Sequence, residues 1–117
     1  MSTATDLGKR GEDAAVRYLE HQGLAILARN WRCDDGELDV IATDGAGLVV
    51  VEVKCRSGTG RGSPLEAVTP EKLDRVRRSA LRWLSTHRIG RVDLRFDVIS
   101  IEWPPDGQVR LHHLRGV

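Results

Sequence analysis

The sequence predicts a single α/β domain in which one helix, three strands, a second helix and two further strands follow one another. Two segments, residues 6–22 and 69–87, repeat apolar positions at three- and four-residue steps, as amphipathic helices do. Between them lies a run of valines that is typical of a strand buried on both faces of a sheet. A length of 117 residues suits one domain, and we expect a mixed sheet of about five strands flanked by helices.

The first half of the chain contains one helix and three strands. The helix is expected over residues 6–22, because Gly23 is a natural C-terminal stop. A short apolar strand at 24–31 and an alternating strand at 37–44 follow. The strand at 48–56 is apolar on both faces and therefore belongs in the middle of the sheet.

The second half adds a helix and a closing pair of strands. Thr69 is a suitable N-cap and Pro70 a favoured first helical residue, so the second helix starts there. Two strands, at 91–103 and 108–115, are separated by the turn sequence "PPDG". The predicted order is αβββαββ.

Composition excludes several classes of protein. The net charge of +1 gives no overall attraction for nucleic acid, and two cysteines are too few for a disulfide framework or a four-thiolate zinc site. Two cysteines suit a reducing compartment, and no apolar run could act as a signal sequence or span a bilayer, so we expect a cytoplasmic protein without a membrane partner. The glycine-rich segment 57–63 lacks the Gly-Lys-Ser/Thr ending of a phosphate loop, so no nucleotide cofactor is expected.

The hairpin between the second and third strands brings charged residues together. A two- or four-residue loop within 44–47 gives a pairing in which opposed residue numbers sum to 91, so that Asp39 faces Glu52 and Glu37 faces Lys54. A three-residue loop would instead place Asp39 and Glu52 on opposite faces. Opposed Cβ atoms are roughly 5 Å apart, so two carboxylates there repel each other unless one is protonated or a cation lies between them.

A divalent cation would remove this repulsion, and carboxylate oxygens favour Mg²⁺ or Mn²⁺. Lys54, on the same side as Glu52, could stabilise a developing negative charge or orient an attacking water. These are the parts of a phosphodiester hydrolase. The alternative is that Glu37 and Lys54 form an ordinary cross-strand ion pair, while water solvates Asp39 and Glu52 at the strand ends.

The second helix carries a concentration of positive charge. Residues 70–91 hold seven basic side chains against two acidic ones, and Arg75, Arg78 and Arg82 share one stripe. Such a stripe could follow the phosphates of a nucleic acid. The residues expected to contact nucleic acid are Lys72, Arg75, Arg78 and Arg82, with Arg56 and Arg61 from the strand end and the glycine-rich loop. The alternative is a solvated helix face with Glu71 and Arg75 as an i,i+4 pair.

Three segments resemble a known family: "GEDAAVRYLEHQGLAILARNWR", "GELDVIATDGAGLVVVEVKCR" and "GSPLEAVTPEKLDRV". They are similar to the YraN-type family of uncharacterised, endonuclease-like bacterial proteins, over the stretch from about Leu7 to Ile101. That family is placed in the PD-(D/E)XK nuclease superfamily, near the archaeal Holliday junction resolvases. The resemblance implies a restriction-endonuclease-like αβββαββ core and a Mg²⁺- or Mn²⁺-dependent endonuclease acting on structured or branched DNA.

The resemblance also implies roles for individual residues. The implied catalytic residues are Glu12, Asp39, Glu52 and Lys54, and the implied metal ligands are Glu12, Asp39, Glu52 and the Val53 carbonyl. Leu38 stands where the superfamily's name has proline, and Arg61 where an aromatic residue is expected. Glu12 also has a plain interpretation as a first-turn acid favoured by the helix dipole.

Two further hypotheses complete the expectations. Resolvase-like nucleases pair two active sites across a two-fold axis, so a homodimer is one of them. The other, of a different class, is a non-catalytic nucleic-acid-binding or scaffolding protein that retains the nuclease fold.

Overall fold

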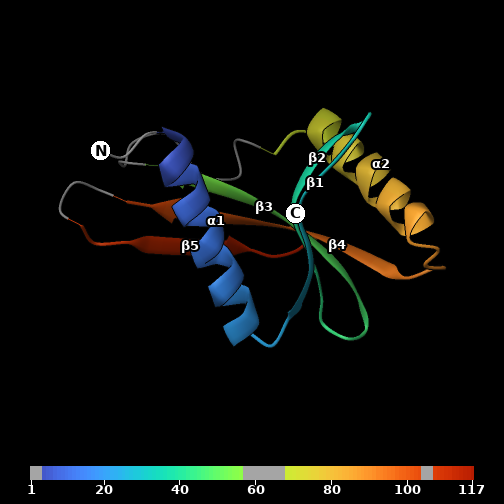
Figure 1. Ribbon diagram of the computed structural model, residues 1–117, viewed down its shortest axis with the longest axis horizontal. Helices are drawn as coiled ribbons and strands as arrows, with labels where there is room; N and C mark the ends of the chain where they lie inside the picture. The colour runs from blue at the N-terminus through green and yellow to red at the C-terminus, as the bar shows by residue number, and fades with distance from the viewer. Residues whose placement is uncertain (1–3, 57–67, 104–106) are drawn as a thin grey trace.

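The computed structural model describes residues 4–56, 68–103 and 107–117, and these residues form the predicted α/β architecture. The elements follow the predicted order: α1 Ala4–His21, β1 Ala25–Cys33, β2 Gly36–Thr43, β3 Gly47–Arg56, α2 Pro70–Thr86, β4 Asp93–Glu102 and β5 Arg110–Leu114 (Figure 1). The strands lie in the order β1-β2-β3-β4-β5, with β3 and β4 parallel and the other neighbours antiparallel. The valine-rich strand β3 is therefore central, as its composition predicts.

Two helix boundaries expected from the sequence are confirmed, the stop at Gly23 and the start at Thr69, whereas α1 begins at Ala4, two residues before its expected start. Gly23, just past α1, has a φ of +93°, a conformation that glycine adopts without strain, and the Leu24 N–H donates to the Leu19 carbonyl (3.1 Å). At the start of α2, the Thr69 hydroxyl accepts a hydrogen bond from the Lys72 N–H (3.1 Å), and Pro70 follows the cap. Neither helix in the described part of the chain has an apolar stretch long enough to span a bilayer.

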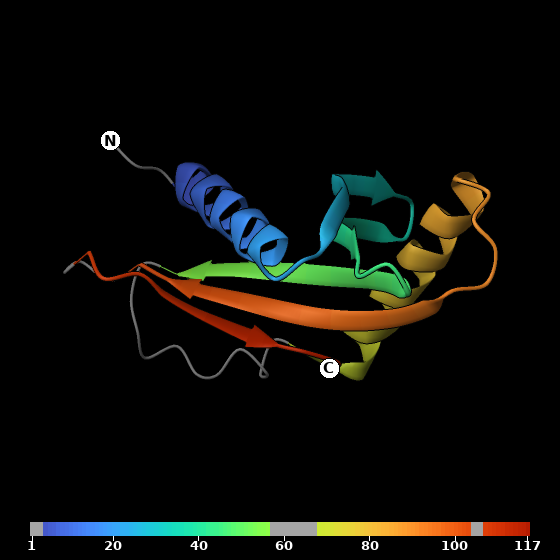
Figure 2. The ribbon, with the colours of Figure 1, turned by 90° about the horizontal axis from the view of Figure 1, so that it is seen from below.

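The two helices cover opposite faces of β3. Leu48 and Val50 point toward α2 and join one apolar cluster, whereas Val49 and Val51 point toward α1 and join another. Figure 2 shows α1 lying along one face of β3, β4 and β5, with α2 crossing the other end of the sheet. Burial on both sides explains why this strand does not alternate apolar with polar residues.

Helix α1 packs closely against β3 at Gly11. A Cβ atom at this position would lie 2.7 Å from Cys55 Sγ and 2.8 Å from Cys55 Cβ. We therefore expect Gly11→Ala to lower the free energy of unfolding by about 1–3 kcal/mol, because overpacking outweighs the better helix propensity of alanine.

Gly8 provides the matched control on the same helix, since a Cβ there meets nothing within 4 Å. Gly8→Ala should raise the free energy of unfolding by roughly 0.5–1 kcal/mol. Urea denaturation of both variants checks the pair, and a stabilised Gly11→Ala protein would contradict the packing of α1 on β3.

The predicted register between β2 and β3 is present, but only over part of its length. The four pairs from Val40–Val51 to Thr43–Leu48 all have residue numbers that sum to 91. Before Val40, the described residues of β2 pair with β1 instead, as far as Gly36 with Cys33. The β1–β2 hairpin thus turns out of the plane of β3, β4 and β5 and lies between the two helices (Figure 2).

The expected backbone pairings of Asp39 with Glu52 and of Glu37 with Lys54 are therefore wrong, and so is the alternative of a Glu37–Lys54 ion pair. Instead, Glu37 lies 3.7 Å from Arg32 Nε, and Lys54 Nζ lies 3.5 Å from Glu52 Oε1. Close to the point where β2 leaves β3, the pairing of β1 with β2 shifts register between Ile26 and Ala28. A bulge increases the local twist and bends a strand, in line with the direction that the hairpin takes away from β3.

Candidate functional site

The divergence of β2 from β3 opens a cleft that the first turns of α2 close on one side. Its volume is about 330 Å³, at the lower end of the range for small-ligand sites. The charged residues lining it include Glu37, Asp39, Glu52, Lys72 and Arg75. Carboxylates from two strands and basic residues from one helix thus meet in a single depression.

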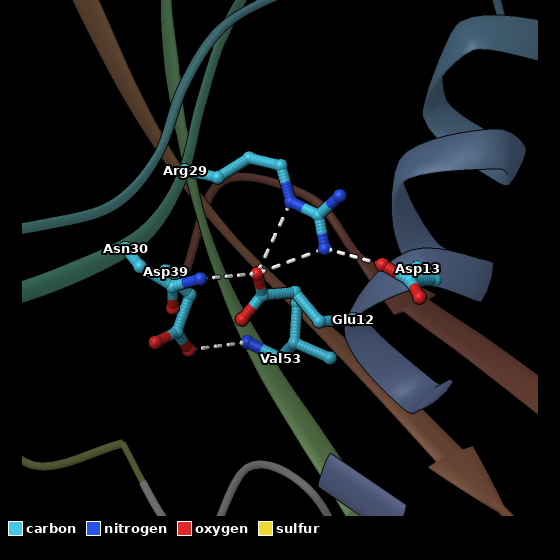
Figure 3. Close-up of polar contacts among 6 residues, drawn as sticks. All are labelled: Glu12, Asp13, Arg29, Asn30, Asp39 and Val53. Atoms are coloured by element: carbon cyan, nitrogen blue, oxygen red, sulfur yellow. Dashed lines mark hydrogen bonds and ion pairs between the residues drawn. The ribbon is translucent and has the colours of Figure 1, made fainter. Parts of the chain in front are cut away.

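Asp39 lies where β2 separates from β3, directly before the first backbone pair, Val40 with Val51. At this point the side chain of Asp39, and not the backbone of β2, forms the hydrogen bond to β3. Its Oδ2 accepts a hydrogen bond from the Val53 N–H (2.9 Å; Figure 3). Burial raises the pKa of Asp39 to about 6; the Val53 N–H acts in the opposite direction, and the negative charges of Glu52 and Glu12 add to the rise. The surroundings of Asp39 thus disfavour its ionised form, and a nearby cation would favour it; carboxyl groups with shifted pKa values are common at functional sites.

Glu52 is held by two lysines. Its Oε1 lies 2.5 Å from Lys72 Nζ and 3.5 Å from Lys54 Nζ. Burial disfavours the charged form of Lys72, but its hydrogen bond and attraction to Glu52 outweigh this and raise the pKa of the ammonium. Lys72, expected from the sequence to contact phosphates, therefore lies inside the cleft and binds a carboxylate.

Glu12 reaches the same region from α1. Its Oε1 accepts hydrogen bonds from Arg29 Nε (3.2 Å), Arg29 Nη2 (3.1 Å) and Asn30 Nδ2 (2.8 Å; Figure 3). Its interpretation as a first-turn acid is wrong, because α1 begins at Ala4, two turns earlier. The charge of Glu12 still reaches Asp39, where it contributes to the raised pKa.

Sequence reasoning missed Arg29 and Asn30, the two residues that position Glu12. Asn30 has a φ of 52°, a left-handed conformation that asparagine tolerates better than most residues. Asparagine is uncommon within strands, so Asn30 near the end of the expected strand was a usable signal of irregular backbone. Arg29 offered no comparable signal.

The donor set suits a hard divalent cation. In the described ranges, no group of three or more His, Cys, Asp or Glu side chains is close enough to hold a metal ion. Mg²⁺, however, commonly takes only one or two protein carboxylates and keeps several waters. Asp39 and Glu52 supply two carboxylates at one cleft, and the desolvation and repulsion at Asp39 are what a cation would relieve.

The predicted basic stripe on α2 divides into two parts. Arg75 lines the cleft, whereas Arg78 Nε and Arg82 Nε lie 3.7 and 3.3 Å from the carboxylate of Asp35, in the β1–β2 turn. The i,i+4 ion pair on this helix joins Asp74 to Arg78 (3.8 Å), and does not involve the expected Glu71.

The two remaining basic residues expected to contact nucleic acid are Arg56 and Arg61. Arg56 is the last residue of β3, and its carbonyl accepts a hydrogen bond from the Trp103 N–H (2.7 Å). Arg61 falls outside the described residues.

Comparisons with known proteins identify relatives over nearly the whole chain. A family described as "Uncharacterised protein family UPF0102" matches residues 11–101, a range that contains all the candidate carboxylates. A UPF0102 protein of Frankia alni is 54% identical over 116 residues, which cover 99% of this chain and 97% of the relative. A UPF0102 protein of Beutenbergia cavernae is 50% identical over 117 residues (100% and 99%), and one of Acidothermus cellulolyticus is 46% identical over 120 (94% and 91%).

Proposed function

The chain belongs to the uncharacterised protein family UPF0102, and we propose that it is a metal-dependent endonuclease of the PD-(D/E)XK superfamily that hydrolyses phosphodiester bonds of structured or branched DNA. One observation carries the proposal. Asp39 is largely buried in a cleft beside Glu52, within the charge field of Glu12, and its pKa is raised to about 6. The same three carboxylates, with Lys54, make up the motif that the sequence resembles.

Each candidate catalytic or metal-binding residue has a role in this proposal. Asp39 and Glu52 hold Mg²⁺ or Mn²⁺ with the Val53 carbonyl, and Glu12, positioned by Arg29, acts through water. When bound, the cation would activate a water molecule and neutralise negative charge on the phosphate. Lys54, 3.5 Å from Glu52, orients the attacking water and stabilises the developing negative charge.

The basic residues of α2 serve binding in this proposal. Arg75 lines the cleft and is placed to contact the phosphate that is cut, whereas Arg78 and Arg82 contact flanking phosphates. Their pairing with Asp35 is partly exposed, so a phosphate can compete for them at modest cost.

A second candidate is a nucleic-acid-binding or scaffolding protein without catalysis. It is favoured by the fact that protein cations already balance two of the carboxylates: lysines contact Glu52, and Arg29 contacts Glu12. In that case the ion pairs are structural, and binding of nucleic acid is indifferent to metal.

The decisive experiment incubates wild type and Asp39→Asn with Mn²⁺ or Mg²⁺ and labelled duplex, single-stranded, flap and four-way-junction DNA. We expect wild type to cut in a metal-dependent way, with preference for branched substrates, and Asp39→Asn to lose cutting while still binding DNA. Asp44→Asn is the matched control: this exposed aspartate caps the turn of the same hairpin through the Ala46 and Gly47 N–H groups, and its variant should cut like wild type.

A second outcome would exclude the proposed nuclease activity. If wild type cuts none of these DNAs, and both proteins bind DNA equally with and without metal, the endonuclease is excluded and the binding protein is favoured.

A further inference from the structure

Lys72 lies at the point where a metal ion is expected. Its ammonium is 2.5 Å from Glu52 Oε1, and it is also attracted by the charge of Asp39. Lys72 comes from the first turn of α2, where the Thr69 cap fixes its backbone. Its side chain is about one quarter exposed (28%), so the ammonium is within reach of solvent.

We propose that Lys72 is an internal counter-cation that competes with the divalent metal for Glu52, and that metal binding moves its ammonium onto the phosphate of the bound nucleic acid. This inference rests on the proposed function and adds a regulation to it. Without nucleic acid, Lys72 keeps the carboxylates neutralised and metal binding weak. With nucleic acid bound, the displaced ammonium gains a new partner.

The competition follows from charge and geometry. A metal ion bound at Glu52 repels the Lys72 ammonium on the same carboxylate, so the two cations compete for Glu52. Lysine can do this because its charge sits at the end of a flexible four-carbon stem. Lys54 is tied less closely to Glu52, at 3.5 Å, and therefore competes less.

The proposal also predicts coupling between the two ligands. A phosphate in the cleft stabilises the displaced ammonium, and so favours the state that binds metal. Metal and nucleic acid should therefore raise each other's affinity by the same factor.

The test measures Mn²⁺ binding by the electron paramagnetic resonance signal of the free ion, which does not depend on cleavage. Lys72→Met and Lys72→Gln should bind Mn²⁺ roughly tenfold more tightly than wild type, a shift of the size expected from one ion pair that no longer has to be broken. Lys72→Arg retains a cation and should resemble wild type. Arg77→Met, which removes one positive charge from an exposed position of the same helix where the guanidinium lies over Phe96, controls for general electrostatics and should change little.

The second part of the test repeats the Mn²⁺ measurement on ice with a four-way DNA junction added. The junction should increase the Mn²⁺ affinity of wild type, and should increase that of Lys72→Met by a smaller factor. If Lys72→Met and Lys72→Gln bind Mn²⁺ no better than wild type while Asp39→Asn abolishes binding, the inference is overturned and the metal site stands. If Mn²⁺ binding does not depend on Asp39 at all, the inference and the proposed function fail together.

Discussion

Asp97→Ala is expected to lower the free energy of unfolding by about 3–5 kcal/mol, because it removes the acceptor from a buried network of charged hydrogen bonds. The Asp97 side chain is fully buried (0% exposed). Its carboxylate accepts from Arg95 Nε and Nη2 (2.9 Å each) and from the Gly116 N–H (3.0 Å), and its Oδ2 lies 2.8 Å from His113 Nε2. Alanine would leave all of these groups without their acceptor.

The network also reaches other elements of the fold. A carboxylate only accepts, so His113 donates through Nε2 and can accept from the Tyr18 hydroxyl at Nδ1 (3.0 Å). This joins α1, β4 and β5. Next to the network, the Val117 N–H donates to the Phe96 carbonyl (2.8 Å), and both residues line the cleft. Loss of Asp97 should therefore loosen one wall of the cleft as well.

The contribution of Asp97 depends on pH in a defined direction. Burial alone would raise its pKa, but hydrogen bonds from Arg95, Gly116 and His113 outweigh burial and lower the pKa below the ordinary value of 3.8. A lowered pKa in the folded state means that the stabilisation is complete above about pH 4. It is lost as the pH falls through the folded-state value.

Urea denaturation at several pH values checks this prediction. The difference in unfolding free energy between wild type and Asp97→Asn should be constant near neutrality and shrink below pH 4. Asp93→Ala, an exposed position at the start of the same strand, should change stability by less than about 0.5 kcal/mol. A loss below about 1 kcal/mol in Asp97→Ala would show that the network is not a main source of stability.

The order of the elements and the central position of β3 could be predicted from the sequence, because the signals are local. Apolar periodicity, the Thr69 cap and the Gly23 stop each act within a few residues. The register of β2 on β3 was also accessible, since the loop length fixes it next to the turn.

The assembly of the site was less predictable, because it depends on contacts between distant segments. The register shift in β1 and the left-handed Asn30 lie close to the point where β2 leaves β3, and neither follows from the periodicity of β2. The placement of Lys72 on Glu52 depends on how α2 crosses the sheet. Likewise, the contact of His113 with Asp97 emerges only when β5 pairs with β4.

Asp39→Asn is expected to raise the free energy of unfolding at pH 7 by about 2–3 kcal/mol, even though it should abolish the proposed activity. Asparagine has the same shape and can still accept the Val53 N–H bond, so the change removes a buried charge and little else. Burial and the neighbouring carboxylates raise the pKa of Asp39 from 3.8 to about 6, which measures the cost of keeping that charge in the folded protein.

The effect of Asp39 on stability changes with pH in the opposite direction to that of Asp97. With a pKa near 6, folded Asp39 holds a proton that the unfolded chain has already lost between about pH 4 and 6. Ionisation of the buried Asp39 carboxyl group therefore lowers the free energy of unfolding progressively as the pH rises from about 4 to 6. Above about pH 6 this loss of stability has reached its full size. The advantage of Asp39→Asn should be largest at pH 7 to 8 and should disappear as the pH falls toward 4.

Thermal or urea unfolding of wild type, Asp39→Asn and Asp44→Asn across this range provides the measurement. Asp44 is the contrasting control, because hydrogen bonds from the Ala46 and Gly47 N–H groups lower its pKa, so its replacement should lose stability near neutrality. Mn²⁺ should stabilise wild type but not Asp39→Asn, since a ligand stabilises only the form that binds it. The proposed metal site depends on an Asp39 carboxyl group whose pKa is raised. If the difference in unfolding free energy between wild type and Asp39→Asn does not change between pH 4 and 8, Asp39 is not such a group.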